Sequence, residues 1–342
     1  MSFHNLSISV LKVGRQLAGS LAVAAFFIPS TTGCLKEEQP VKPHNPGNVI
    51  TRSINLSSDY RYQIFYNLEQ DSIISSNLKT DWDIAFQSSA LPNTEGSKVI
   101  LNPSKFMSAW NTNREDIEKI SDTTGFFKNR LWDAANRPDT MSIGDVLGQT
   151  KTFWIDRGYD EKGDQLDFVK IKFISVDKQK YVIAVEKKGD RNAQLFEIQK
   201  DINRNYSYFS FTSKSQVTIE PKKTDWDLMF TQYIHTFSEP YQPYLVTGVL
   251  LNPYNTYAAV DSTIDFNKID INVAQNMQLR QASDVIGYNW KEYGFTGTIY
   301  KTYSHWNYVV RNSQGIYFKL HFIDFYDAQG TKGHPKFEFQ KL

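Results

Sequence analysis

Two stretches of this chain surround a tryptophan with carboxylates in the same way. TDWDIAF contains Trp82 and Asp83, and TDWDLMF contains Trp226 and Asp227. Paired carboxylates are the catalytic groups of most glycoside hydrolases. Because the same arrangement occurs twice, at the start of two predicted strands, we expect packed tryptophans and structural aspartates rather than a catalytic pair.

Other catalytic patterns are missing from the sequence. It contains no nucleophile elbow, HExxH zinc motif, P-loop or dinucleotide-binding fingerprint. The only cysteine, Cys34, leaves no disulfide, CxxC motif or iron–sulfur site. The acid-rich stretch Asp156–Asp164 lacks the terminal Glu and the spacing of an EF-hand, so we expect a hairpin turn there. The sequence therefore predicts a protein that is not an enzyme.

Charge and composition restrict the class of partner. The 38 basic and 37 acidic residues give a net charge of +1, which provides no field that would attract nucleic acid. Aromatic residues make up 14% of the chain and occur in short alternating runs. This pattern is typical of β-sheets.

The N-terminal residues have the composition of an export signal. Lys12 and Arg15 precede the apolar run Leu21–Ile28, and small residues lead to Cys34. We expect residues 1–33 to be a signal peptide. The stretch TTGC resembles the lipobox of bacterial lipoproteins, although Thr31 stands where Leu is usual. This resemblance implies that Cys34 carries lipid and is the mature N-terminus.

The residues after Cys34 indicate how the protein is displayed. LKEE resembles the export signal of surface lipoproteins in Bacteroidetes. Residues 34–48 are rich in proline and read as a semi-extended tether. We therefore expect a protein at the outer membrane, held there only by its lipid anchor and facing the cell surface.

The rest of the chain repeats itself. Four pairs of segments match in the same order, which indicates a tandem duplication with changes in loop length. The pairs are TDWDIAF and TDWDLMF, VILNP and VLLNP, GDVLG and SDVIG, and FVKIKFISV and YFKLHFIDF.

Alternation within the last pair predicts which side chains are buried. A strand with one buried face carries apolar residues at every second position. Lys170, Lys172, Lys319 and His321 are then expected to face solvent. The expected buried residues are Val169, Ile171, Phe173, Phe318, Leu320 and Phe322.

The sequence has turn signals at hairpin-like intervals and few helix signals. The best helix signal is Asn113–Ile120, with acidic residues in its first turn. We expect an all-β protein of antiparallel sheets. Its two tandem modules should occupy residues 49–200 and 201–342.

The two copies together resemble a known family. Tyr206–Tyr233 has an aromatic strand, a short polar stretch and a Trp-Asp strand in the order found in HmuY, the haem-binding lipoprotein family of Bacteroidetes. Trp306–Phe339 resembles the closing hairpins of that family. The likeness covers the second copy nearly throughout and the first copy more weakly.

The resemblance implies a cofactor and a partner. It implies that haem is bound by axial His or Met ligands from extended loops and delivered to a TonB-dependent outer-membrane receptor. In the corresponding region of the second copy, the candidate ligands are Met277, His305 and His235, and no metal other than haem iron is expected. The alternatives are packing for Met277 and surface or rim positions for the two histidines.

Two functions remain open at this stage. The first is a lipoprotein that binds haem or a related ligand for uptake. The second is a surface protein on the same fold that binds glycan or protein without haem. In that case the loop Ile234–Leu245, with its three aromatic residues, would make the contacts.

Overall fold

The computed structural model describes residues 46–89, 96–294 and 299–342. The predicted signal peptide, Cys34 and most of the tether lie outside these ranges. The described residues belong to one compact unit by their contacts. In the described ranges, no helix has the length and apolar character needed to cross a bilayer.

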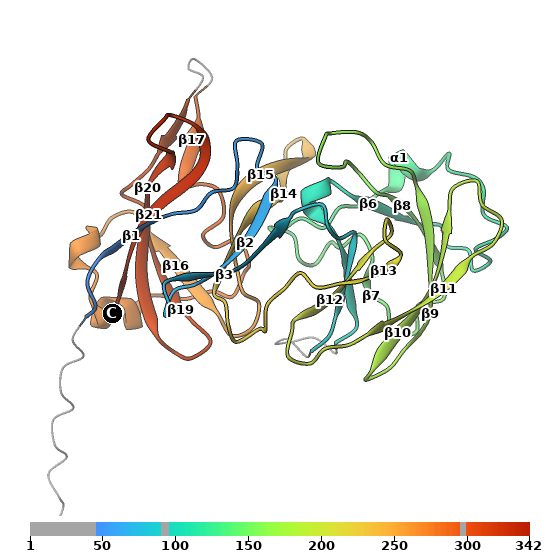
Figure 1. The fold of residues 1–342 in the computed structure, drawn as a ribbon, viewed down its shortest axis with the longest axis horizontal. Coiled ribbons are helices and arrows are strands. Elements are labelled where there is room, and N and C mark those ends of the chain that lie inside the picture. The colour runs from blue at the N-terminus through green and yellow to red at the C-terminus, as the bar shows by residue number, and fades with distance from the viewer. Residues whose placement is uncertain (1–45, 90–95, 295–298) are drawn as a thin grey trace, which may run out of the picture. The chain divides into compact units, whose positions relative to one another are not determined.

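Four antiparallel sheets and one small hairpin make up the fold, so the predicted all-β class is confirmed (Figure 1). One sheet has the order β1 (Ile50–Ser53), β21 (Lys332–Lys341), β20 (Tyr317–Tyr326), β19 (Asn307–Arg311) and β16 (Tyr257–Asp261). The next has β15 (Tyr241–Leu251), β14 (Leu228–Ser238), β2 (Tyr62–Asn67) and β3 (Ser72–Leu78).

The first half of the chain supplies most of the other two sheets. One contains β13 (Ser215–Val217), β12 (Tyr206–Ser210), β4 (Ile84–Gln87), β5 (Lys98–Leu101) and β7 (Gly144–Asp145). The other contains β11 (Gln194–Gln199), β10 (Lys180–Lys187), β9 (Val169–Val176), β8 (Thr152–Asp156) and β6 (Ser108–Asn111). The small hairpin is β17 (Lys291–Tyr293) with β18 (Tyr300–Thr302).

Helical structure is limited to short segments in the described ranges. They are α1 (Phe126–Asn129), α2 (Ile271–Asn276) and the 3₁₀ turns η1 (Pro103–Lys105) and η2 (Phe266–Lys268).

The two halves of the chain exchange a hairpin. The β2–β3 hairpin of the first half pairs with β14 of the second, with Ile64 opposite Phe230. The β12–β13 hairpin of the second half pairs with β4 of the first, with Phe209 opposite Ile84. Hydrogen bonding therefore crosses the expected 200/201 boundary in both directions, and the module bounds stay a prediction.

The repeated motif fastens each exchanged hairpin. The Asp83 amide donates to the Phe209 carbonyl at 3.0 Å, and its carboxylate accepts from the Phe211 amide at 2.7 Å. In the same way, the Asp227 amide donates to the Tyr66 carbonyl at 2.9 Å, and the Asp227 carboxylate accepts from the Leu68 amide at 2.8 Å.

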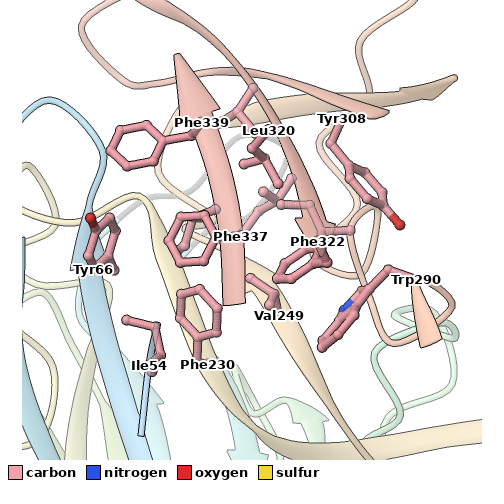
Figure 2. Packing of buried hydrophobic residues seen from close by; sticks show 14 of the residues in the cluster. Ile54, Tyr66, Phe230, Val249, Trp290, Tyr308, Leu320, Phe322, Phe337 and Phe339 are labelled. Carbon is pink, nitrogen blue, oxygen red and sulfur yellow. The ribbon is translucent and has the colours of Figure 1, made fainter. Parts of the chain in front are cut away.

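Each half has its own large apolar core, which includes residues of the hairpin received from the other half. In the second-half core, Tyr66 meets Phe337 edge-on at 5.6 Å, and Trp290 stacks on Phe322 at 4.0 Å (Figure 2). The six side chains predicted to be buried by alternation all belong to these two cores.

Two predictions about the outer face of these strands are wrong. Lys170 and Lys319 are buried rather than exposed, because loops cover that face and offer carbonyl groups to the ammonium. Lys170 Nζ donates to Ile117 O at 2.6 Å and Ile120 O at 2.8 Å. The covering segment 113–120 is therefore irregular chain instead of the predicted helix. Lys172 and His321 are partly exposed.

Candidate functional site

The two repeated tryptophans lie in a small cluster at the junction of the halves. Trp82 meets Tyr208 edge-on, and Trp226 meets Phe65 edge-on, both with ring centroids 4.9 Å apart. Tyr208 lies in β12 and Phe65 in β2, so each tryptophan packs on an aromatic residue that the other half of the chain supplies. Both indoles are buried.

A cavity of about 250 Å³ adjoins this cluster, and we call it the junction cavity. Its walls are mostly apolar and come from both halves of the chain. They include the aromatic residues Phe65, Trp82, Tyr206, Tyr208, Trp226 and Tyr233, and the thioethers Met141 and Met229.

Three residues with polar side chains in the wall of the junction cavity are buried: Asn205, Glu220 and Tyr233. Glu220 accepts hydrogen bonds from Trp226 Nε1 at 3.3 Å and from the Tyr206 amide at 3.0 Å. Burial nevertheless raises the pKa of the Glu220 carboxyl to about 7, because the charged form loses its hydration. Asn205 Oδ1 and the Tyr233 hydroxyl are buried and have no hydrogen-bond partner among the described residues.

One face of β14 continues from the junction cavity to the tip of the β14–β15 hairpin. Alternate residues of a strand share a face, and on this face Met229 and Tyr233 line the cavity. His235 and Phe237 follow on the same face. Tyr244 of β15 is paired directly opposite His235. We call His235, Phe237, Tyr244 and Tyr288 the β14 aromatic face.

His235 is held by rings rather than by hydrogen bonds. Its imidazole packs edge-on against Phe237 at 5.2 Å and Tyr288 at 5.0 Å. Nδ1 is buried without a partner, and no hydrogen bond to Nε2 is present among the described residues. Burial lowers the pKa of His235, and Asp284 opposes this shift. The imidazole is therefore neutral at pH 7 and has an uncommitted lone pair.

The other two candidate ligands lie elsewhere. Met277 follows α2 and is half-buried in a separate cluster with Val309 and Leu342. His305 is exposed and near Tyr303, with ring centroids 5.9 Å apart. No contact in the described part of the chain joins Met277, His305 and His235 to one another.

The remaining described histidines are already engaged. His321 contacts the Ser304 carbonyl through Nδ1 at 2.8 Å and Glu338 through Nε2 at 3.0 Å. His334 lies 3.1 Å from the Thr331 carbonyl. Within the described residues, no three or more His, Cys, Asp or Glu side chains lie close enough together to hold a metal ion.

The predicted contact loop Ile234–Leu245 forms the tip of the β14–β15 hairpin. It exposes 43% of Phe237, 48% of Tyr241 and 55% of Tyr244. The tip is fixed to the first half of the chain, because Asn136 exchanges two 2.9 Å hydrogen bonds with the backbone of Thr236. Three aromatic side chains are thus exposed on a well-supported hairpin.

A second cavity, of about 440 Å³, is lined by first-half residues and by the β12–β13 hairpin of the second half. Phe196, Phe209 and Phe211 form part of its wall, and Arg157 and Lys187 supply positive charge. None of its lining residues is His, Met, Cys or Tyr, so it offers no side chain that ligates haem iron.

Sequence reasoning selected His235 but missed its surroundings. Alternation along LMFTQYIHTF already places Met229, Tyr233 and His235 on one face. Tyr288 and Asn205 gave no such signal, because they come from distant loops that only the folded chain brings near.

Comparison with known proteins adds a family to this geometry. The family model described as HmuY protein matches residues 59–339. No curated protein matches the chain.

Three solved structures are similar to the chain at low sequence identity. Apo PinO from Porphyromonas gingivitis shares 11% identity at a TM-score of 0.34, over 86% of this chain and 98% of that one. The apo HmuY analogue TFO from Tannerella forsythia shares 12% identity at a TM-score of 0.25, over 87% of this chain and 98% of that one. A HmuY-like protein from Bacteroides vulgatus, itself proposed to bind haem, shares 13% identity at a TM-score of 0.22, over 85% of this chain and 90% of that one.

Proposed function

Because the chain belongs to the HmuY family, we propose that it binds haem or a related ligand on the β14 aromatic face and hands it to a TonB-dependent outer-membrane receptor. In this proposal it is a binding protein rather than an enzyme.

The observation that carries the proposal is the state of His235. Haem iron takes an axial lone pair from an imidazole or a thioether. His235 has such a lone pair because its ring is neutral and makes no hydrogen bond among the described residues. Its Nδ1 is buried, so an external haem would meet Nε2, which makes no hydrogen bond among the described residues.

The aromatic side chains around His235 suit a flat, apolar ligand. Phe237, Tyr244 and Tyr288 supply rings beside the imidazole, and Phe237 and Tyr244 are about half exposed. A ligand of the size of haem does not fit the junction cavity, whose 250 Å³ is below the roughly 300–1,000 Å³ of drug-sized sites. The ligand would therefore lie along the exposed end of the hairpin.

Haem itself would supply the iron and its redox chemistry, while this chain supplies a ligand and an apolar surface. Met277 and His305 stay candidates for a second axial ligand. Both lie in parts of the fold that no described contact connects with His235.

A haemin titration tests the proposal directly. The mature protein should shift the Soret band of haemin and saturate at a defined stoichiometry. An unchanged spectrum with both ferric and ferrous iron would rule haem out. The function that remains would then be that of a surface protein, which binds glycan or another protein through Phe237, Tyr241 and Tyr244.

The membrane attachment is also a proposal. We infer that Cys34 becomes the lipidated N-terminus after residues 1–33 are removed, and that the protein is held at the outer membrane by this lipid alone. Cys34→Ser should abolish incorporation of labelled fatty acid and release the protein from the membrane fraction. Retention of both label and membrane association would contradict the inference.

A further inference from the structure

We propose that the second cavity binds a small apolar molecule that carries one carboxylate, of the class of the arylacetates. The proposal does not depend on haem binding, because neither His235 nor any other residue of the β14 aromatic face lines this cavity.

A row of phenylalanine rings forms the apolar part of the cavity wall. The ring centroid of Phe209 lies 5.1 Å from that of Phe196 and 5.8 Å from that of Phe211. Phe209 and Phe211 are buried, and so is Val169, which lines the same cavity. Neighbouring rings of this kind offer faces and edges on which a further aromatic ring packs well.

Arg157 supplies a hydrogen-bond donor for the ligand. Its Nη2 donates to Asp83 Oδ2 at 3.2 Å and to Thr212 Oγ1 at 2.6 Å. No hydrogen bond from Nη1 is present among the described residues, and Nη1 is not one of their fully buried atoms without a partner. Because Arg157 lines the cavity and keeps 10% of its side-chain surface accessible, Nη1 is the donor that a ligand in the cavity can meet.

The buried charges behind the wall favour an anion. Asp83 lies between two buried cations, with Lys105 at 2.5 Å and Arg157 at 3.2 Å. One carboxylate therefore faces two positive charges, and the excess charge lies in the cavity wall at Arg157. A guanidinium binds a carboxylate through strong, charge-assisted hydrogen bonds, so the carboxylate of a ligand would balance this charge.

The mouth of the cavity admits such a ligand. Lys187, Asp190, Gln194 and Lys214 line the cavity and are exposed. Lys187 is paired with Asp167 at 2.8 Å, and the charges of Lys214 and Asp190 are opposite, so the mouth adds no net charge. The volume of about 440 Å³ falls within the roughly 300–1,000 Å³ of small-molecule sites and is enough for two fused rings.

A pair of ligands that differ in charge tests the proposal. Naphthylacetate and naphthylacetamide are titrated into the mature protein at pH 7 while the methyl signals of Leu166, Val169 and Val185, which line the cavity, are followed by NMR. We expect saturable shifts with the carboxylate and at least tenfold weaker binding of the amide, because the neutral amide gains no charge-assisted bond from Arg157. Equal affinities for the two ligands, or no saturable shift with the carboxylate, would overturn the proposal.

A pair of variants tests the location. Val185→Phe places a ring in the cavity and should weaken naphthylacetate binding at least tenfold. Val182→Phe makes the same change at another half-buried valine of β10 that does not line the cavity, and it should leave binding unchanged. Equal binding by the two variants would place the ligand elsewhere and overturn the proposal.

A cross-check separates this site from the proposed haem site. Val185→Phe should bind haemin as the wild type does, and His235→Ala should bind naphthylacetate as the wild type does, because the two sites share no residue. Loss of naphthylacetate binding in His235→Ala would show that the carboxylate binds at the β14 aromatic face instead, which would overturn the proposal.

Discussion

Asp83 and Asp227 occupy the same position in the two copies of the motif, yet their electrostatic surroundings differ. Asp83 forms buried ion pairs with Lys105 at 2.5 Å and Arg157 at 3.2 Å. Asp227 has no ion pair among the described residues, and burial raises the pKa of its carboxyl to about 6. Both aspartates make matching backbone hydrogen bonds, and among the described residues Asp83 alone of the two balances buried cations.

Alanine at each position should therefore have unequal effects. Asp83→Ala leaves Lys105 and Arg157 buried without their counter-charge and should lower the free energy of unfolding by about 3–5 kcal/mol. Asp227→Ala removes one acceptor from the Leu68 amide and should cost about 1–2 kcal/mol. Urea unfolding of both variants checks this, and equal losses would contradict the assigned difference in charge pairing.

Lys291 offers a prediction about pH. It is buried, and its Nζ donates to the Thr247 carbonyl and lies over the rings of Trp290, at 4.6 Å, and Phe325, at 4.9 Å. Burial lowers its pKa to about 7. Because the folded pKa is below the unfolded value, the unfolded chain binds more protons between pH 7 and 10.5, and stability rises with pH across that window.

Lys291→Met should therefore stabilise the protein near pH 7, on the order of 2 kcal/mol, and the gain should vanish near pH 10.5. Unfolding midpoints in urea at pH 7 and pH 10 measure this. A variant that is less stable than the wild type at pH 7 would show that the aromatic rings stabilise the ammonium by more than burial costs.

Individual strands were predictable from the sequence, but their partners were not. Alternation identified Val169, Ile171 and Phe318 as core residues. It placed Lys170 and Lys319 in solvent because nothing local reveals that a loop crosses the outer face of the sheet. The hairpin exchange was equally hidden, since β2 and β12 have the alternation of any edge strand, and pairing over such a distance leaves no local pattern.

A close approach between elements gives a prediction about β15. A Cβ on Gly248 would lie 2.4 Å from the Gly287 carbonyl oxygen, where two backbone hydrogen bonds join Val249 and Gly287. Gly248→Ala should thus cost about 1–3 kcal/mol through overpacking. At Gly47 the nearest atom to a new Cβ is 3.5 Å away, so Gly47→Ala is the control and should be near neutral. Similar unfolding midpoints for the two variants would show that the approach is relaxed in solution.

At the scale of the whole molecule, the exchanged hairpins make each half depend on the other. Sheet partners of β4 and β14 come from the opposite half, and Asp83 and Asp227 fasten those hairpins. Four matched segments in the same order predict a tandem duplication, and this stays a prediction. The sequence did not predict the candidate site in full, since His235 could be selected but Tyr288 and the junction cavity depend on the fold.

Separated halves should therefore fold poorly alone. Residues 49–200 and 201–342, expressed individually, should lack a cooperative unfolding transition and should regain one when mixed, because each supplies the hairpin that the other needs. Far-UV circular dichroism with thermal melts measures this. A stable, cooperatively unfolding monomer from either half would show that its own hairpin can replace the exchanged one.

If His235 binds haem iron, the absorption spectrum of the haemin complex should change in one of a matched pair of variants and not in the other. His235→Ala should lose the Soret shift or bind haemin at least tenfold more weakly. His334→Ala, which removes a histidine already held by the Thr331 carbonyl, should bind as the wild type does. Because burial lowers the pKa of His235, wild-type binding should persist as the pH falls to 6.5 and weaken only below it. An unchanged Soret shift in His235→Ala would contradict the account.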